Sequence, residues 1–383
     1  MAADSRLARR INDRMALDLI AAAGRLSRTQ LREQIGLAQP SVIDLVNRLL
    51  DAELIRVAGE SDERTRGPRP QMYAIAGERA YVAGVHGSTG AIHAVVGDVS
   101  GWTSPTVSIP DPRLQDDPAP QVEAAIDAAF AAAGLAKHPL TAVVIGTGGA
   151  IDLSTGDIGH APGLRHWQAH FIAPVRERLG CPVHLEREIT LAAVAEDRFG
   201  GEESPERFAL LWVGDGLGIS CIDQGVPFRG FWGAAGEIGY LPLPSVGPDP
   251  APPHTFQDLA GSSAVLALAH AHGLSDPTAE GAVRTAVEQG CQPFLEELAD
   301  RLALGLHAIA TVIDPGNVVL SGSTAAAGGA DLAERVEAAL ASRTWQQVQV
   351  LHAKYAHGEE AILRAALLLA TEHGRDAVWG RAA

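Results

Sequence analysis

The sequence has little of what would mark several protein classes. Aromatic residues make up only 5% of its 383 residues, and its three cysteines, Cys181, Cys221 and Cys291, lie far apart. No CxxC motif and no Cys/His spacing of a zinc site occurs. We therefore expect the cysteines to be small buried hydrophobic residues, and we expect neither a metal nor another cofactor.

Long apolar segments are missing as well. No run of about 18 apolar residues occurs, so we expect no membrane span. The segment MAADSRLARRINDR at the start of the chain lacks the apolar core of a signal peptide. We therefore expect a cytoplasmic protein.

Charge is distributed unevenly along the chain, whose net charge is −16. Residues 1–79 carry 13 Arg and 11 acidic residues, a net charge of +2, so residues 80–383 carry −18. An acidic surface repels the phosphate backbone, so any nucleic-acid contact is expected from the first part. We predict two domains, a head (residues 1–79) and a body (residues 80–383).

The head has the pattern of a helix-turn-helix. Apolar residues at helical spacing predict a first helix that ends at Gly24. Ser27 is suited to cap a second helix, and Gly36 supplies the turn after it. Pro40 falls in the first turn of a third helix, at about residues 39–52, where its missing N–H costs nothing.

The polar face of this third helix predicts base contacts. Polar side chains at the N-terminal end of a recognition helix reach base edges in the major groove. We predict that Gln39, Ser41, Asn47 and Arg48 read bases.

Two short apolar segments beyond this helix, at residues 54–57 and 71–75, enclose an Arg-rich tip and predict a wing. Arg64, Arg66 and Arg69 are expected to hold the DNA backbone or to enter a minor groove. The alternative is a helical protein-interaction module with a solvated run of charge.

The body has the pattern of an α/β protein. Strands alternate with helices, and each strand ends in Gly or polar residues. Two strand–Gly-turn–strand units, at residues 81–98 and 208–223, form a weak internal repeat, which suggests two related halves with a cleft between them. We expect one long helical stretch at about residues 278–313.

Several motifs of the body, together with the head, resemble the ROK family (repressors, open reading frames and sugar kinases), and specifically its transcriptional-repressor branch. The motifs are Gly84–Gly101, Ile145–Asp152, Leu164–Trp167, Glu186–Ala192, Gly214–Gly218, Gly233–Tyr240 and Asp314–Ser323. The resemblance implies an N-terminal winged helix-turn-helix followed by an actin-like/hexokinase-type two-lobed α/β body with a sugar cleft. It also implies a dimer or a higher even oligomer.

The phosphate cradle of the family's kinases is altered in this sequence. The matching stretch of those kinases reads Asp-x-Gly-Gly-Thr-Lys, whereas this chain has His86, Ser88, Thr89 and Ala91 at the Asp, Gly, Gly and Lys positions. Side chains now stand where backbone should approach phosphate, and the acidic residue and the Lys charge are gone. We therefore expect no kinase activity and no catalytic residue.

The motif that supplies the catalytic base in similar kinases is also altered. Glu188 keeps a carboxylate at the position of the catalytic Asp, and it can accept hydrogen bonds from a ligand hydroxyl. Arg187 replaces an Asn that contacts sugar hydroxyls in similar proteins. Two interpretations of Arg187 stay open: a solvent-facing partner of Glu186 or Glu188, or a cleft residue that favours an anionic or otherwise unusual ligand.

Other cleft positions follow from the resemblance. Glu237 matches the family's sugar-binding Glu, and Tyr240 stands where similar proteins have a His that binds sugar and zinc. Gln257 stands about where similar proteins have a further sugar-contacting Glu, and Gly149 belongs to the IGTGGAID motif. The family's zinc cysteines are absent from the Pro-rich segment 241–253. We predict ligand contacts at Gly149, Arg187, Glu188, Glu237, Tyr240 and Gln257.

These observations predict a transcriptional regulator, specifically a repressor of carbohydrate-related genes. Its partners would be a double-stranded DNA operator and a small-molecule effector, a sugar or an anionic sugar derivative. Two alternatives stay open: an active sugar kinase with a DNA-binding head, and a regulator that no longer binds a sugar.

Overall fold

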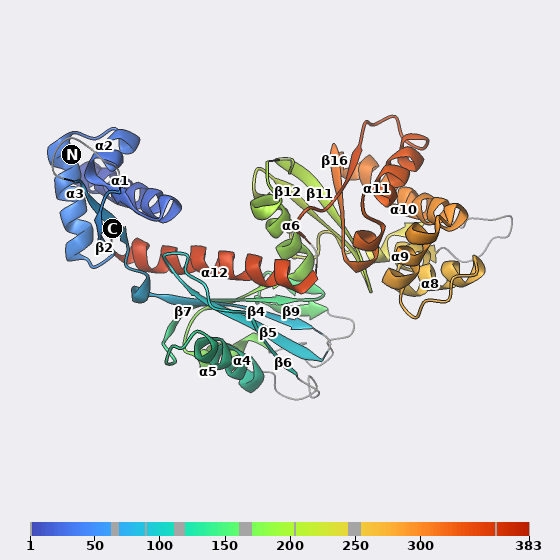
Figure 1. Cartoon of the computed structure of the whole chain (residues 1–383), viewed down its shortest axis with the longest axis horizontal. Helices are drawn as coiled ribbons and strands as arrows, with labels where there is room; N and C mark the ends of the chain where they lie inside the picture. Colours follow the sequence, from blue (N-terminus) through green and yellow to red (C-terminus); the bar gives the residue numbers. More distant parts are fainter. Residues whose placement is uncertain are drawn as a thin grey trace.

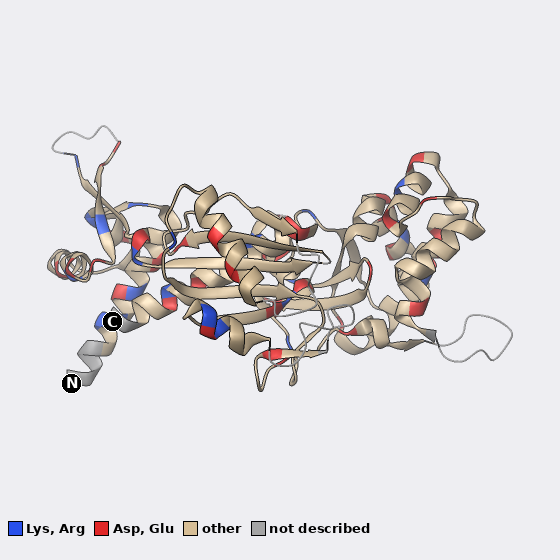
Figure 2. Cartoon of the chain, turned by 90° about the horizontal axis from the view of Figure 1, so that it is seen from below, with Lys and Arg blue, Asp and Glu red and all other residues tan. Residues whose placement is uncertain are grey.

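The computed structural model describes residues 2–62, 69–88, 90–110, 119–160, 171–202, 204–243, 254–356 and 358–382. Along its longest axis the chain has a small N-terminal unit at one end and two α/β lobes beyond it (Figure 1). Figure 2 shows Asp and Glu positions spread over the helices of these lobes. No helix in the described part is both long and apolar enough to cross a membrane.

The head consists of three helices and a three-stranded sheet of order β1-β3-β2. Ser27 caps α2 through a capping box with Gln30, and Gly36 ends that helix in a left-handed conformation. Pro40 lies in the first turn of the third helix, as predicted. The elements are α1 (Ala2–Ala23), β1 (Leu26–Ser27), α2 (Arg28–Ile35), α3 (Gln39–Asp51), β2 (Ile55–Glu60) and β3 (Gln71–Ile75).

The first lobe is built on a five-stranded sheet of order β10-β7-β4-β5-β6. Helices α4 and α5 pack on one face, and α6 and α12 pack on the other. Its elements are η1 (Gly77–Arg79), β4 (Tyr81–Ser88), β5 (Ala91–Asp98), β6 (Val107–Pro110), α4 (Ala119–Ala132), β7 (Leu140–Thr147), β8 (Ala150–Asp152), β9 (Asp157–His160), α5 (Ile172–Leu179), β10 (Val183–Arg187), α6 (Glu188–Phe199) and α12 (Gly358–Ala382).

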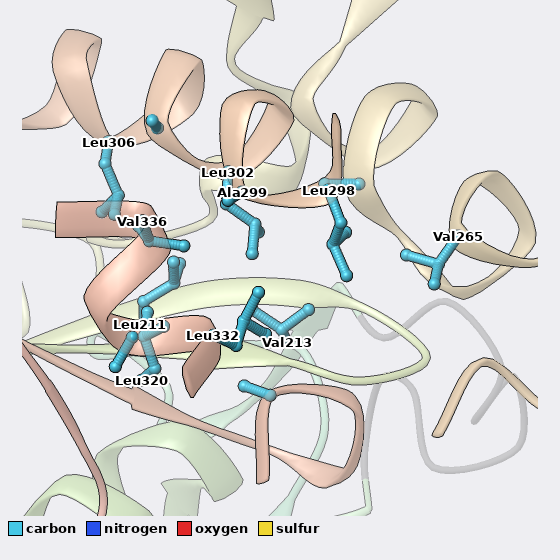
Figure 3. Close-up of a cluster of buried hydrophobic side chains, with 14 of the residues drawn as sticks. Leu211, Val213, Val265, Leu298, Ala299, Leu302, Leu306, Leu320, Leu332 and Val336 are labelled. Atoms are coloured by element: carbon cyan, nitrogen blue, oxygen red, sulfur yellow. The ribbon is translucent and has the colours of Figure 1, made fainter. Parts of the chain in front are cut away.

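The second lobe has a sheet of order β13-β12-β11-β16-β17. Leucines of α10 and α11 pack on β11 and β16 in its main core (Figure 3). Its elements are β11 (Arg207–Val213), β12 (Leu217–Asp223), β13 (Val226–Pro227), η3 (Ile238–Tyr240), β14 (Pro242–Leu243), β15 (His254–Thr255), α7 (Phe256–Ala260), α8 (Ser262–Ala271), α9 (Ala279–Gln289), α10 (Gln292–Ile313), β16 (Asn317–Ser321), α11 (Ser323–Ala341) and β17 (Gln349–His352).

The two lobes repeat one arrangement, which agrees with the weak internal repeat of the sequence. Each lobe contains an antiparallel hairpin, β4–β5 in one and β11–β12 in the other. The first strand of each hairpin also pairs in parallel with a later strand, β4 with β7 and β11 with β16. Helix α6 lies between the two sheets, and its alanines share one core with both. The fold class expected from the sequence is confirmed.

One expected helical stretch is divided in two. Residues 278–313 are helical as predicted, but they form two helices, α9 and α10. Gly290 adopts a left-handed conformation (φ 68°) that ends α9, and Pro293 stands in the first turn of α10. Pro lacks the N–H that helix interiors need, so the chain begins a new helix there.

The hydrophobic core of the head extends beyond residue 79. Trp379 at the end of α12 is only 2% exposed and belongs to the same cluster as Leu17, Leu45 and Tyr73. Val99, which follows β5, belongs to it as well. The predicted boundary at residue 79 thus separates segments that share a core, and it stays a prediction.

Candidate functional site

A cavity of about 640 Å³ lies between the two lobes. The turn after β7 and the start of α6 form one wall, and the β11–β12 turn, the segment around η3 and α7 form the other. All six predicted ligand contacts line it: Gly149, Arg187, Glu188, Glu237, Tyr240 and Gln257. We call this cavity the cleft.

Arg187 is buried in the cleft wall. It is 6% exposed and precedes the first residue of α6. Its Nη2 donates to Glu237 Oε1 at 2.6 Å, and its Nη1 donates to the carbonyl oxygen of Ala235. The solvent-facing interpretation of Arg187 is therefore wrong, and Glu186 instead pairs with Arg229 at 2.5 Å. The guanidinium of Arg187 thus pairs with the carboxylate of Glu237, to which the resemblance assigns sugar binding.

Glu188 also has a partner within the protein. His86 Nε2 lies 2.9 Å from Glu188 Oε1, and the imidazole is only 2% exposed. An ionised carboxylate only accepts hydrogen bonds, so this contact requires the imidazole tautomer with its proton on Nε2. His86 stands at the position of the cradle's Asp, and its strand β4 is otherwise apolar or Gly up to Ser88. The contact of His86 with Glu188 is not predicted from the sequence.

A second histidine, His93, connects the His86–Glu188 pair to helix α12. The rings of His86 and His93 lie 5.9 Å apart, and His93 Nε2 lies 3.0 Å from Glu359 Oε2. Ser88 Oγ lies 3.1 Å from the same nitrogen. Burial lowers the pKa of His93, the Glu359 carboxylate opposes that shift, and the nearby His86 adds to it. His93, just beyond the stretch that matches the cradle, thus contacts His86, Ser88 and the first turn of α12.

Gln257 and Tyr240 contribute to the cleft in different ways. The Gln257 Oε1 atom accepts from Leu217 N at 3.0 Å, and its Nε2 donates to Asp215 O at 2.9 Å, so its amide holds the β11–β12 turn. Tyr240 is 58% exposed at the cleft. Both remain predicted ligand contacts. Trp167, which the sequence places near this site, lies outside the described residues.

The cleft carries more negative than positive charge. Besides Glu188 and Glu237, the carboxylates of Asp215 and Asp258 line it, whereas Arg187 is the only Lys or Arg among the described lining residues. Neither aspartate is among the residues predicted from sequence, although Asp215 lies two residues after β11, in the GDGLG turn. In the described part of the chain, no group of three His, Cys, Asp or Glu is arranged to hold a metal ion.

On the head, α3 presents a polar exposed face. Gln39, Ser41 and Asn47 are exposed, and Arg28 Nη2 donates to Asn47 Oδ1 at 3.2 Å. The Arg48 side chain is 40% exposed, and its Nη2 forms an ion pair with Asp13 of α1 at 2.5 Å. That pair links α3 to α1, and the role of Arg48 in base contact stays a prediction.

The predicted wing is described in part. β2 and β3 pair in antiparallel fashion, with a register shift between Val57 and Glu60. Arg69 lies two residues before β3, whereas Arg64 and Arg66 lie outside the described residues. The role of all three in DNA contact stays a prediction.

Comparison with known proteins agrees with this geometry. The ROK family model matches residues 82–372, and a winged helix-turn-helix DNA-binding model matches residues 9–56. The chain belongs to the ROK family. It is similar to the xylose repressor of Bacillus subtilis, with 24% identity over 64% of this chain and 64% of the relative. The matched region covers 60 to 64% of the length of three curated relatives, this repressor among them.

Two solved structures share the fold. A ROK family transcriptional regulator, described as a homologue of the Escherichia coli Mlc protein, matches with a TM-score of 0.76 and 18% identity over 98% of both chains. The ROK hexokinase from Thermus thermophilus matches with a TM-score of 0.59 and 24% identity, over 77% of this chain and 99% of its own. The regulator thus aligns with head and body together, and the hexokinase with a smaller part.

Proposed function

We propose that the chain is a DNA-binding transcriptional repressor of carbohydrate-related genes, controlled by a small molecule in a cleft that no longer transfers phosphate. The observation that carries this proposal is the state of the former phosphate cradle. His86 binds Glu188, the carboxylate at the position of the catalytic base, and Ala91 stands at the Lys position. A transferred phosphoryl group needs a cradle that neutralises its charge, and none of these side chains does so.

The exposed face of α3 supports DNA as the partner of the head. Gln39 and Ser41 lie at the N-terminal end of the helix, where recognition helices contact base edges. We propose that two heads of a homodimer bind the halves of a palindromic operator, about 34 Å apart.

The charges of the cleft support a neutral, polyhydroxylated effector rather than an anionic derivative. Arg187 already forms an ion pair with Glu237, and three more carboxylates line the cleft. An anionic ligand would meet net repulsion, whereas carboxylates accept readily from hydroxyl groups. The name xylose repressor, carried by several relatives, fits a sugar as effector.

Selection of DNA from a randomised duplex pool by the full chain tests the DNA-binding proposal. We expect enrichment of a two-fold symmetric sequence. Failure to enrich any sequence at low salt, where phosphate contacts are strongest, would contradict it.

Two assays separate the alternatives. A coupled ATP-consumption assay across common sugars should show no turnover, and robust turnover would favour the sugar kinase. A thermal-shift screen with neutral sugars, sugar acids and sugar phosphates should show stabilisation by a neutral sugar. Silence across the whole screen would favour a regulator that no longer binds a sugar.

A further inference from the structure

Helix α12 joins the cleft to the head. It begins at Gly358, close to the former cradle, and ends at Ala382 beside the head (Figure 1). Twenty residues separate Glu359 from Trp379, which corresponds to about 30 Å along a helix. We propose that α12 transmits the state of the cleft to the DNA-binding head, an inference that rests on the proposed function.

At the head end, α12 is held by packing and by charge. Trp379 is buried in the head's core, and the guanidinium groups of Arg14 and Arg375 lie 5.1 and 5.3 Å from its ring centre. Arg14 Nη1 donates to Asp376 Oδ1 at 2.6 Å. A buried aromatic ring with two flanking cations resists sliding, so a movement of the end of α12 must move α1 with it.

Along its length, α12 lies close against the first sheet. A Cβ on Gly84 of β4 would lie 2.6 Å from the backbone nitrogen of Leu367, and one on Gly374 would lie 2.7 Å from Val82 Cγ1. Backbone therefore packs directly on backbone at the first contact. Packing this close leaves little room for the helix to bend, so displacement at one end is carried to the other.

At the cleft end, two routes connect α12 to Glu188. The first runs through side chains, from Glu188 to His86, then to His93 and to Glu359. The second runs through α6, which begins at Glu188. Near its end, the 2%-exposed Glu196 accepts from the backbone N–H groups of Lys354, Tyr355 and Ala356, at 2.8 to 2.9 Å. The last of these three residues lies two positions before the start of α12.

A ligand hydroxyl that binds Glu188 would compete with His86 for the same carboxylate. Such competition changes the hydrogen bonding of His86, which reaches Glu359 through His93, and the position of α6, whose Glu196 holds residues 354–356. A ligand shifts an equilibrium only by its differential affinity for two states, and this competition supplies one.

Hydrogen exchange of the full chain, without DNA or ligand, tests the transmission. Glu359→Gln removes the carboxylate that contacts His93, and we expect exchange in α1 and in residues 371–380 to rise about two- to fivefold, the range expected for the loss of one half-exposed polar contact. Glu360→Gln is the matched control, because it removes the same charge from the same helical turn. It should leave exchange in the head unchanged.

A second variant tests whether the effect travels through α12. In a Trp379→Ala background, Glu359→Gln should have no further effect on α1. Should Trp379→Ala unfold the head, Asp376→Asn releases the same end more gently. A change confined to residues 86–95 and the first turn of α12, or an equal distal change in Glu360→Gln, would overturn the proposal. Since no DNA or effector takes part, either result leaves the proposed function to its own tests.

Discussion

The polar side chains on the exposed face of α3 and those in the cleft of the body differ in whether they have partners within the protein. Gln39 and Ser41 on α3 are exposed and have no hydrogen-bond partner among the described side chains. In the cleft, Arg187 pairs with Glu237 and Glu188 pairs with His86. A surface that meets a large partner can stay hydrated until binding, whereas a buried pocket must satisfy its own polar groups.

This difference indicates where the sequence is free to change. The head keeps the side chains that a DNA reader needs, because water satisfies them at no cost. In the cleft, by contrast, polar side chains pair with each other. Breaking those internal contacts should therefore affect stability, whereas changes on α3 should affect only DNA binding.

The largest effect is expected at the Arg187–Glu237 pair. Glu237→Ala leaves the buried guanidinium, 7% exposed, without its counter-ion and should lower the free energy of unfolding by about 3 kcal/mol. Arg187→Ala should cost less, because the Glu237 side chain is 29% exposed and can be hydrated. Urea unfolding measures both.

The exposed pair Arg207–Asp223 provides the control for that comparison. Its atoms are 2.6 Å apart, but the side chains are 65% and 72% exposed. Asp223→Ala should cost no more than about 1 kcal/mol. Equal losses in Glu237→Ala and Asp223→Ala would mean that the cleft pair contributes no more than a surface pair.

The next effect concerns base contact. Gln39→Ala should weaken binding to the selected operator about 10- to 100-fold while leaving the free energy of unfolding unchanged, because its side chain is exposed. Gln289→Ala, an exposed Gln at the end of α9, is the matched control. Gel-shift titration gives both affinities. An operator affinity that Gln39→Ala leaves intact would remove this residue from the interface.

A smaller effect is expected at the wing. Arg69→Ala should weaken binding to all duplexes to a similar degree and reduce the slope of log affinity against log salt by about 1, because one phosphate contact is lost. Arg284→Ala on the body is the control, and its salt slope should match the wild type. A change in sequence preference without a change in slope would instead assign Arg69 to base contact.

The smallest effect concerns pH. His184 of β10 stacks on His373 of α12 with ring centres 4.0 Å apart. Burial lowers the pKa of His184 below its ordinary value of 6.5, and His373 and Arg176 lower it further. The unfolded chain therefore binds the proton more readily, so this residue's contribution is complete above pH 6.5 and is lost as the pH falls.

Thermal unfolding between pH 7.5 and 5.5 checks the sign of that shift. The melting temperature of His184→Gln should fall less on acidification than that of the wild type, by about 2 °C or less. A steeper fall in the variant would mean that protonated His184 stabilises the fold.

The parts that could be predicted from sequence are those with local signals. Ser27, Gly36 and Pro40 mark helix ends through their own backbone preferences, so the head's helices were placed within a residue or two. Strand and turn patterns placed the two hairpins in the same way. The resemblance to the family then predicted the six residues that line the cleft.

What could not be predicted depends on contacts between distant segments. Arg187 and Glu237 are fifty residues apart, and Arg48 and Asp13 are thirty-five apart, so nothing local marks them as partners. Helix α12 is not among the elements predicted from sequence. The role of its apolar residues becomes clear only from the sheet that they cover. Trp379 joins the head's core although it lies at the other end of the chain.

The most direct test of the contrast between head and cleft is a DNA selection run in parallel on three proteins: the wild type, Gln39→Ala/Ser41→Ala and Glu188→Gln. The account predicts that the wild type and Glu188→Gln enrich the same two-fold symmetric sequence, and that the α3 variant does not enrich it. Enrichment of the same sequence by the α3 variant, or no enrichment by the wild type, would contradict the assignment of α3 as the element that reads DNA.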